Sequence, residues 1–129
     1  MNTKITFITA VFILLLVIIA CSPPTTILEF TFANEAQFDT TLTAEINGNQ
    51  VYEKELVSYV TAGGYFGQEF EYVSLETPAA EFSLTVQENQ TGLTQSMMID
   101  PSKGKYVSVT FWEGRLIIGQ HLEKPMRID

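Results

Sequence analysis

The sequence predicts an all-β protein: an antiparallel β-sandwich of seven or eight strands that follows an export signal. Three observations lead to this prediction. After Cys21 the apolar residues alternate with a period of two, turn residues recur about every 8 to 12 residues, and no apolar pattern of helical period reaches helical length. The length of 129 residues allows one domain and little more.

The first segment, residues 1–20, has the pattern of a secretory signal peptide. A polar start with one cation, Lys4, precedes an almost unbroken apolar run that ends at Ala20. The run from Ile5 would measure roughly 24 Å as a helix, which is short of the ~30 Å hydrocarbon core of a bilayer. An uncleaved membrane anchor is therefore the less favoured alternative.

The end of this run, Ile18-Ile19-Ala20-Cys21, resembles the lipobox of bacterial lipoproteins. The resemblance implies cleavage before Cys21, a diacylglycerol group on its sulfur, and acylation of the new α-amine by a fatty acid such as palmitate. Two or three acyl chains give durable membrane attachment, whereas one chain binds only reversibly. The resemblance also implies a location in the bacterial cell envelope, at the outer membrane if the organism has two membranes.

The mature chain divides into a short tether, residues 21–26, a sandwich domain, residues 27–123, and a C-terminal tail, residues 124–129. Each strand follows from a short run rich in β-branched and aromatic residues, and each boundary from turn residues such as Asn47-Gly48, the strongest hairpin signal in the chain. The expected strands span residues 27–33, 38–46, 51–59, 66–75, 81–88, 93–100, 106–112 and 115–122.

Alternation within each run predicts which side chains face the core. Most runs alternate cleanly, and Phe38 is expected to point inward with Leu42, Ala44 and Ile46. The run 51–59 is irregular, which indicates an edge strand, a bulge or a register shift. In the run 66–75 the apolar parity changes after Tyr72, so we expect a bulge near residues 72–74.

Seven or eight short strands joined by tight turns in about 100 residues are typical of immunoglobulin-like sandwiches. The chain resembles that family in architecture alone, because the cysteine pair of antibody domains is absent: Cys21 is the only cysteine.

Composition excludes several classes of function. The chain has 15 acidic and 7 basic residues; cleavage removes Lys4 and leaves a formal charge of −9, which makes nucleic acid an improbable partner. No nucleophile motif accompanies the single histidine, His121, and no zinc or EF-hand motif occurs, so we expect neither an enzyme nor a cofactor. The carboxylate pairs Glu53/Glu55 and Glu69/Glu71 leave a calcium site as a minor alternative to a solvated acidic face.

The candidate binding residues are aromatic. Trp112 and Tyr106 have the parity opposite to the inward residues of their strand, and Tyr59 and Tyr65 flank the Gly63-Gly64 loop. Such rings suit protein hot spots or sugar rings. The sequence therefore predicts a lipid-anchored, non-catalytic module that binds an unidentified envelope protein, with a carbohydrate-binding surface lipoprotein as the alternative.

Overall fold

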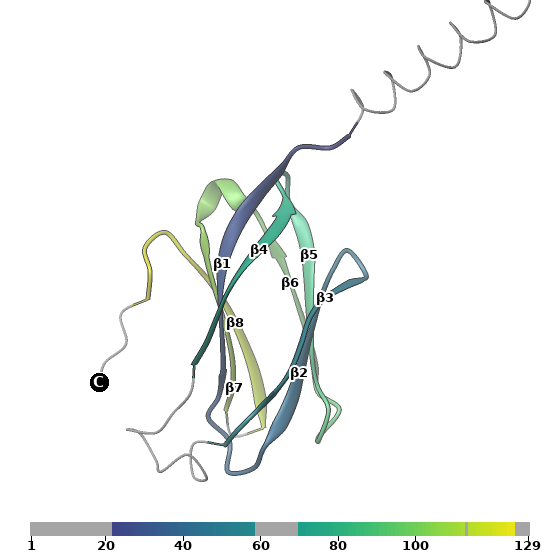
Figure 1. Cartoon of the computed structure of the whole chain (residues 1–129), viewed down its shortest axis with the longest axis vertical. Coiled ribbons are helices and arrows are strands. Elements are labelled where there is room, and N and C mark those ends of the chain that lie inside the picture. The colour runs from purple at the N-terminus through teal and green to yellow at the C-terminus, as the bar shows by residue number, and fades with distance from the viewer. Residues whose placement is uncertain (1–21, 59–69, 113, 126–129) are drawn as a thin grey trace, which may run out of the picture.

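The computed structural model describes residues 22–58, 70–112 and 114–125, which form eight β-strands and one short 3-10 helix. Figure 1 shows the strands packed in two layers. In chain order the elements are β1 (Thr25–Asn34), β2 (Thr40–Ile46), β3 (Asn49–Leu56), β4 (Phe70–Pro78), β5 (Phe82–Glu88), β6 (Thr94–Ile99), η2 (Pro101–Lys103), β7 (Tyr106–Trp112) and β8 (Arg115–His121).

Each layer is a four-stranded sheet. One has the strand order β4-β1-β7-β8 and the other β3-β2-β5-β6, and the chain crosses between them after β1, β3, β4 and β6. The predicted β-sandwich of seven or eight strands is confirmed. One detail differs from the fully antiparallel prediction: β1 and β7 are paired in parallel, from Glu29 opposite Tyr106 to Asn34 opposite Phe111.

The core lies between the sheets, where the inward residues of the alternating strands meet. Alternation places every second side chain on the same face, so a strand that contributes to one core buries a period-two set. The expected inward residues of β2, β5 and β7 are confirmed as buried: Leu42, Ala44, Ile46, Phe82, Leu84, Val86, Val107, Val109 and Phe111. From β1 they are joined by Leu28, Phe30 and Phe32.

The β2–β3 hairpin turns at the predicted dipeptide. Asn47 and Gly48 both have positive φ, 50° and 82°, as a type I′ turn requires. β3 is an edge strand, and its pairing with β2 shifts register between Ala44 and Glu45. The irregularity expected in this run is therefore confirmed.

The tether is shorter than predicted. Thr25 and Thr26, which we assigned to it, pair with Pro78 and Thr77 as the first residues of β1. The Ala79 amide also donates to the Pro24 carbonyl at 3.0 Å, so the chain is already fixed to the sandwich at Pro24.

The predicted bulge near residues 72–74 is wrong. β4 pairs with β1 in continuous register from Phe70 to Pro78, so its pattern stays constant: Val73 and Leu75 pack against the core, while Tyr72 and Ser74 face outward. Glu71 shares the parity of Val73 without disturbing the register, because Lys54 of the opposite sheet pairs with it. The strand was expected to end at residue 75, but it continues to Pro78.

Phe38 is the other correction to the predicted core. It precedes β2, which begins at Thr40, and its side chain is largely exposed. Its ring meets Phe111 edge to face, with the centroids 5.8 Å apart. The neighbouring Asp39 side chain accepts a hydrogen bond from the Ser58 amide at 2.8 Å, so this segment closes a loop and does not extend the strand.

Candidate functional site

The outer faces of the two sheets differ in chemistry. We call the outward side of β4-β1-β7-β8 the aromatic face, and that of β3-β2-β5-β6 the polar face. The aromatic face presents Ile27, Glu29, Thr31, Tyr72, Ser74, Glu76, Tyr106, Ser108, Thr110, Trp112, Arg115, Ile117, Gly119 and His121.

Strand register places the aromatic side chains in order across this face. Tyr72 on β4 lies opposite Thr31 on β1, and Tyr106 on β7 lies opposite Glu29. Trp112 lies at the other end of β7, six residues from Tyr106, which is about 20 Å along a strand. The predicted binding residues Tyr106 and Trp112 therefore share one face and lie at its two ends.

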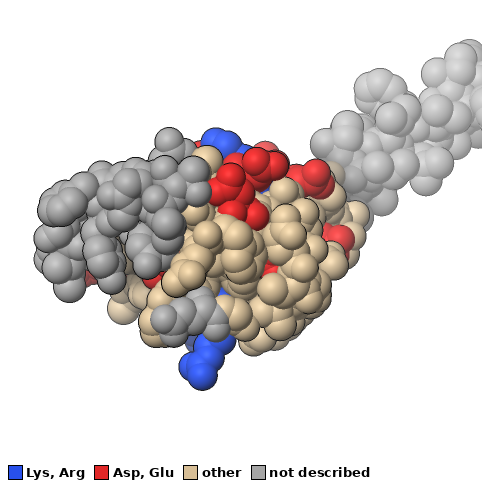
Figure 2. Space-filling view, turned by 90° about the horizontal axis from the view of Figure 1, so that it is seen from below, with Lys and Arg blue, Asp and Glu red and all other residues tan. Residues whose placement is uncertain are grey.

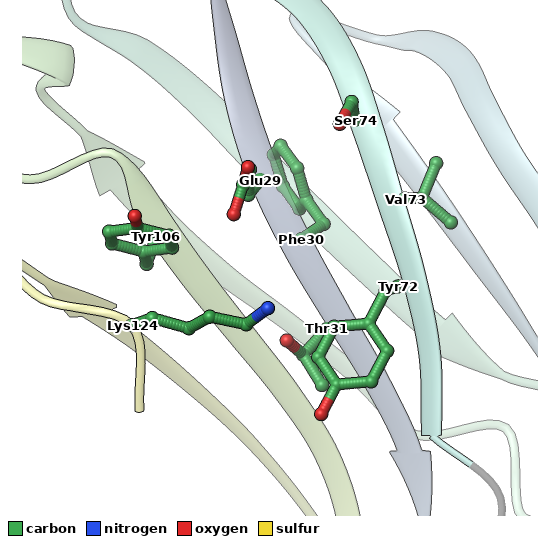
Figure 3. Close-up of a pocket in the computed structure, with 8 residues that line it drawn as sticks. All are labelled: Glu29, Phe30, Thr31, Tyr72, Val73, Ser74, Tyr106 and Lys124. Atoms are coloured by element: carbon green, nitrogen blue, oxygen red, sulfur yellow. The ribbon is translucent and has the colours of Figure 1, made fainter. Parts of the chain in front are cut away.

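A shallow hollow of about 140 Å³ opens on the aromatic face between β4 and β7. Figure 3 shows Tyr72 and Tyr106 on its two sides. Glu29 and Thr31 of β1 lie between the two rings, and Ser74 completes the β4 side. Oxygen groups thus face the hollow from its base, while the tyrosine rings form its walls.

The residue that reaches into this hollow from outside the sheet is Lys124. It follows the end of β8, and its Nζ lies 5.0 Å from the centroid of the Tyr72 ring. That separation is a cation–π contact, in which the electron-rich ring face attracts the ammonium. The first residue of the predicted C-terminal tail therefore contacts the aromatic face.

His121 lies beside this hollow and makes one specific contact. Its Nε2 is 2.9 Å from the Ser108 Oγ on the neighbouring strand. Gly119 leaves room for the ring, because a Cβ at that position would come within 3.0 Å of both atoms. Among the residues that the structure describes, no carboxylate contacts the His121 ring, so the pair has no third member that would orient the imidazole.

The polar face carries mostly hydroxyl, amide and carboxylate side chains. Its outward positions are Thr41, Thr43, Glu45, Gln50, Glu53, Glu55, Ser83, Thr85, Gln87, Thr94, Ser96 and Met98. Hydrogen bonds connect neighbours on it, such as Thr85 to Ser96 at 2.9 Å and Gln50 to Glu53 at 3.1 Å. Met98 is the single large exposed hydrophobic residue on the described strands of this sheet.

One open side of the sandwich is bridged by an ion pair between the sheets. Lys54 Nζ of β3 lies 2.6 Å from the Glu71 carboxylate of β4. Under this pair the Tyr52 ring stacks on Phe32, with the centroids 3.8 Å apart, and its buried hydroxyl has no hydrogen-bond partner among the described residues. Burial, and secondly the Glu71 carboxylate, raise the pKa of the Tyr52 phenol above its usual value.

The positions of the acidic side chains on β3 and β4 test the possible calcium site. Glu53 and Glu55 project from the polar face, whereas Glu71 has inward parity and pairs with Lys54; Glu69 lies outside the described residues. The three described carboxylates therefore do not converge as the alternative required. No group of three or more potential metal-ligating side chains occurs in the parts of the chain that the structure describes.

A buried carboxylate closes one end of the polar sheet. Glu88, the last residue of β5, accepts hydrogen bonds from the Thr40 and Thr91 hydroxyls and from the amides of Gln90 and Thr91, at 2.6 and 2.8 Å for the amides. Burial alone raises the pKa of Glu88, but these donors outweigh it and hold the pKa below its usual value.

Not every predicted site residue falls within the described chain. Cys21, Tyr59 and Tyr65 lie outside it. The residue that our choice of binding side chains missed is Tyr72, which forms the hollow together with Tyr106. Reading residues 71, 73, 75 and 77 as one uninterrupted inward series would have placed Tyr72 outward.

Charge is distributed unevenly over the domain. Figure 2 views it from its lower end in Figure 1 and shows acidic side chains gathered on one side, with isolated lysine or arginine side chains elsewhere.

Between residues 22 and 125, leaving out the undescribed positions, no helix is long and apolar enough to cross a membrane. Comparison of the chain with protein-family models, curated proteins and solved structures found no match.

Proposed function

We propose that this protein is a lipid-anchored, non-catalytic binding module of a bacterial envelope, and that it recognises a partner protein with the aromatic face. The observation that carries the proposal is the difference between the two outer faces. Seven large hydrophobic side chains are exposed in the described part of the chain, and four of them lie on the aromatic face: Ile27, Tyr72, Trp112 and Ile117, which are 63%, 55%, 41% and 46% exposed.

Exposed apolar side chains that gather on one face of a small domain are characteristic of interaction sites. Trp and Tyr dominate interface energetics because they offer large rigid surfaces with a polar edge, and arginine is enriched with them. Arg115 pairs directly with Trp112 across the β7–β8 hairpin. This combination supports protein recognition at that end of the face.

The net negative charge of the mature chain indicates the kind of partner surface it favours. The mature chain carries 15 acidic and 6 basic residues, so a partner surface rimmed by lysine or arginine would associate faster and with less repulsion than an acidic one. The four strands of the face extend about 14 Å across and about 20 Å along β7. A face of these dimensions suits the smaller, transient class of interface.

The proposed lipid on Cys21 would hold the aromatic face close to the membrane surface. Because Pro24 is already bonded to the sandwich, only Ser22 and Pro23 separate it from the lipidated position, and the three Cα–Cα steps span at most about 11 Å. A module held this near the bilayer meets partners in the same plane at a high effective concentration.

The anchor is tested by metabolic labelling with a clickable fatty acid. We expect label on the native chain and none on Cys21→Ala. Equal labelling of the two chains, or a mature protein that still begins at Met1, would exclude the lipid anchor.

The binding face is tested by quantitative co-purification from native membranes. Trp112→Ala should reduce the recovered envelope partner about tenfold, whereas Met98→Ala on the polar face should leave it unchanged. Equal recovery with both variants contradicts the proposal. Retardation of the native protein in a glycan-containing gel, lost on Trp112→Ala, would instead establish the carbohydrate-binding alternative.

A further inference from the structure

The hollow on the aromatic face has a chemistry more specific than the rest of that face. Two tyrosine rings form its walls and the Glu29 carboxylate lies between them. Ring faces carry partial negative charge and the carboxylate carries a full one, so all three groups favour a cation.

A cation of this chain already lies at the hollow. Figure 3 shows the Lys124 side chain extended from the segment after β8, its amine directed toward Thr31 and the Tyr72 ring, with Glu29 and Tyr106 farther from it. The Nζ lies 5.0 Å from the Tyr72 centroid. Lys124 therefore reveals what the hollow accepts: an ammonium group on a flexible aliphatic stem.

Few contacts hold Lys124 in place. It lies three residues beyond the end of β8 and has an exposed side chain. Within the described chain the recorded ion pair is Lys54 with Glu71, so Glu29 and Lys124 do not form a direct one. A group tied this loosely can exchange with an equivalent group from another molecule.

We infer that the hollow is a binding site for a lysine or arginine side chain of the partner protein, and that Lys124 occupies it in the unbound state. The inference rests on the proposed function, whose partner has a basic rim, and assigns one of those basic side chains to a defined position. Displacement by the partner moves the Lys124 amine away from the Tyr72 ring, and the incoming cation takes its place.

Competition from Lys124 has a measurable consequence. When part of the population has its site filled internally, the apparent dissociation constant for an external ligand rises in proportion. Removal of Lys124 should therefore tighten binding of an external cation, although it deletes a side chain that lines the site. A residue that only supported the site would have the opposite effect.

The test uses the full lipid-anchored chain in detergent, with Nα-acetyl-lysine methylamide as the probe and its Nε-acetylated, uncharged counterpart as the control. Binding is followed at matched ionic strength by NMR of the tyrosine ring signals, assigned by substitution of Tyr72 and Tyr106. We expect saturable shifts of both rings with the charged probe alone.

Two matched pairs of variants complete the test. Lys124→Ala should tighten binding roughly three- to tenfold, while Lys103→Ala, which removes the same charge from η2, should change it less than about twofold. Glu29→Gln should weaken binding of the charged probe roughly three- to tenfold. Glu53→Gln, which removes the same charge from the polar face, should leave the affinity for the probe unchanged.

The inference is overturned if the uncharged probe binds equally, if Lys124→Ala behaves like Lys103→Ala, or if glucose and not the lysine probe shifts the two rings. Trp112-dependent recovery of the partner reports separately on the proposed function. Recovery that still depends on Trp112 when the probe fails would leave the function in place and remove this site alone.

Discussion

The two outer faces of the sandwich have the same strand geometry and different side chains. On the polar face, hydroxyl groups form a hydrogen bond across strands, as Thr85 does with Ser96. On the aromatic face, Ile27, Trp112 and Ile117 are exposed to solvent, although burial of such surface would be favourable at about 25 cal/mol per Å². This difference supports the proposal that a partner binds the aromatic face and not the polar face.

This comparison separates stability from binding. If the comparison is correct, substitutions that remove hydrogen bonds of the polar sheet should lower the free energy of unfolding and leave recovery of the partner unchanged. Substitutions of exposed residues on the aromatic face should do the reverse.

The largest effect is expected at the end of the polar sheet. Glu88→Gln replaces a carboxylate that accepts four hydrogen bonds, two from hydroxyls and two from backbone amides, so it should lower the free energy of unfolding by about 2–3 kcal/mol. Urea unfolding measures this change, with the exposed Glu81→Gln as control, which should stay within about 0.5 kcal/mol. Equal stability of the two variants would contradict the role of Glu88.

The same carboxylate predicts a pH dependence. Because folding lowers the pKa of Glu88, its stabilising contribution is fully present above the usual glutamate pKa of about 4.3 and is lost as the pH falls through the lowered value. The native protein should therefore lose more stability on acidification than Glu88→Gln. Parallel acid limbs for the two proteins would show that Glu88 is not responsible.

The next effect tests the aromatic face directly. Ile117 and Met98 are exposed to a similar extent, 46% and 54%, on opposite faces. Ile117→Ser should reduce quantitative partner recovery about tenfold, corresponding to about 1.4 kcal/mol, without changing the thermal midpoint. Met98→Ser should have no effect on recovery, and a loss as large as that of Ile117→Ser would break the distinction between the faces.

The smallest effect is expected beneath the ion pair that joins the sheets. The Tyr52 hydroxyl is buried and finds no hydrogen-bond partner in the part of the chain that the structure describes, while its ring stacks on Phe32. Tyr52→Phe keeps the ring and removes the unpaired polar group, so stability should stay unchanged or rise by up to about 1 kcal/mol. A clear decrease in urea unfolding would indicate that the hydroxyl contributes a bond, and Phe32→Leu provides the control for loss of stacking.

The fold followed from the sequence because each strand is governed by local alternation and each hairpin by local turn residues. The positive φ of Asn47 and Gly48 is of this kind. The errors arose where a distant residue decided the outcome. Glu71 could take an inward position in β4 because Lys54, on another sheet, pairs with it, and no local pattern contains that partner.

The candidate site was predictable in part for the same reason. Parity alone placed Tyr106 and Trp112 outward, and both lie on the aromatic face. The hollow was not predictable, because it requires the β1–β4 and β1–β7 registers that bring Tyr72, Glu29 and Tyr106 together. Lys124 joins them from a tail that carries no periodic signal.

The most direct test of the aromatic face is position-specific crosslinking in native membranes. A photo-crosslinking amino acid is placed at Ile117 in one protein and at Met98 in another, and crosslinked products are identified by mass spectrometry. The account predicts an envelope protein with a basic surface crosslinked from position 117 and absent from position 98. The same product from both positions, or from position 98 alone, would contradict it.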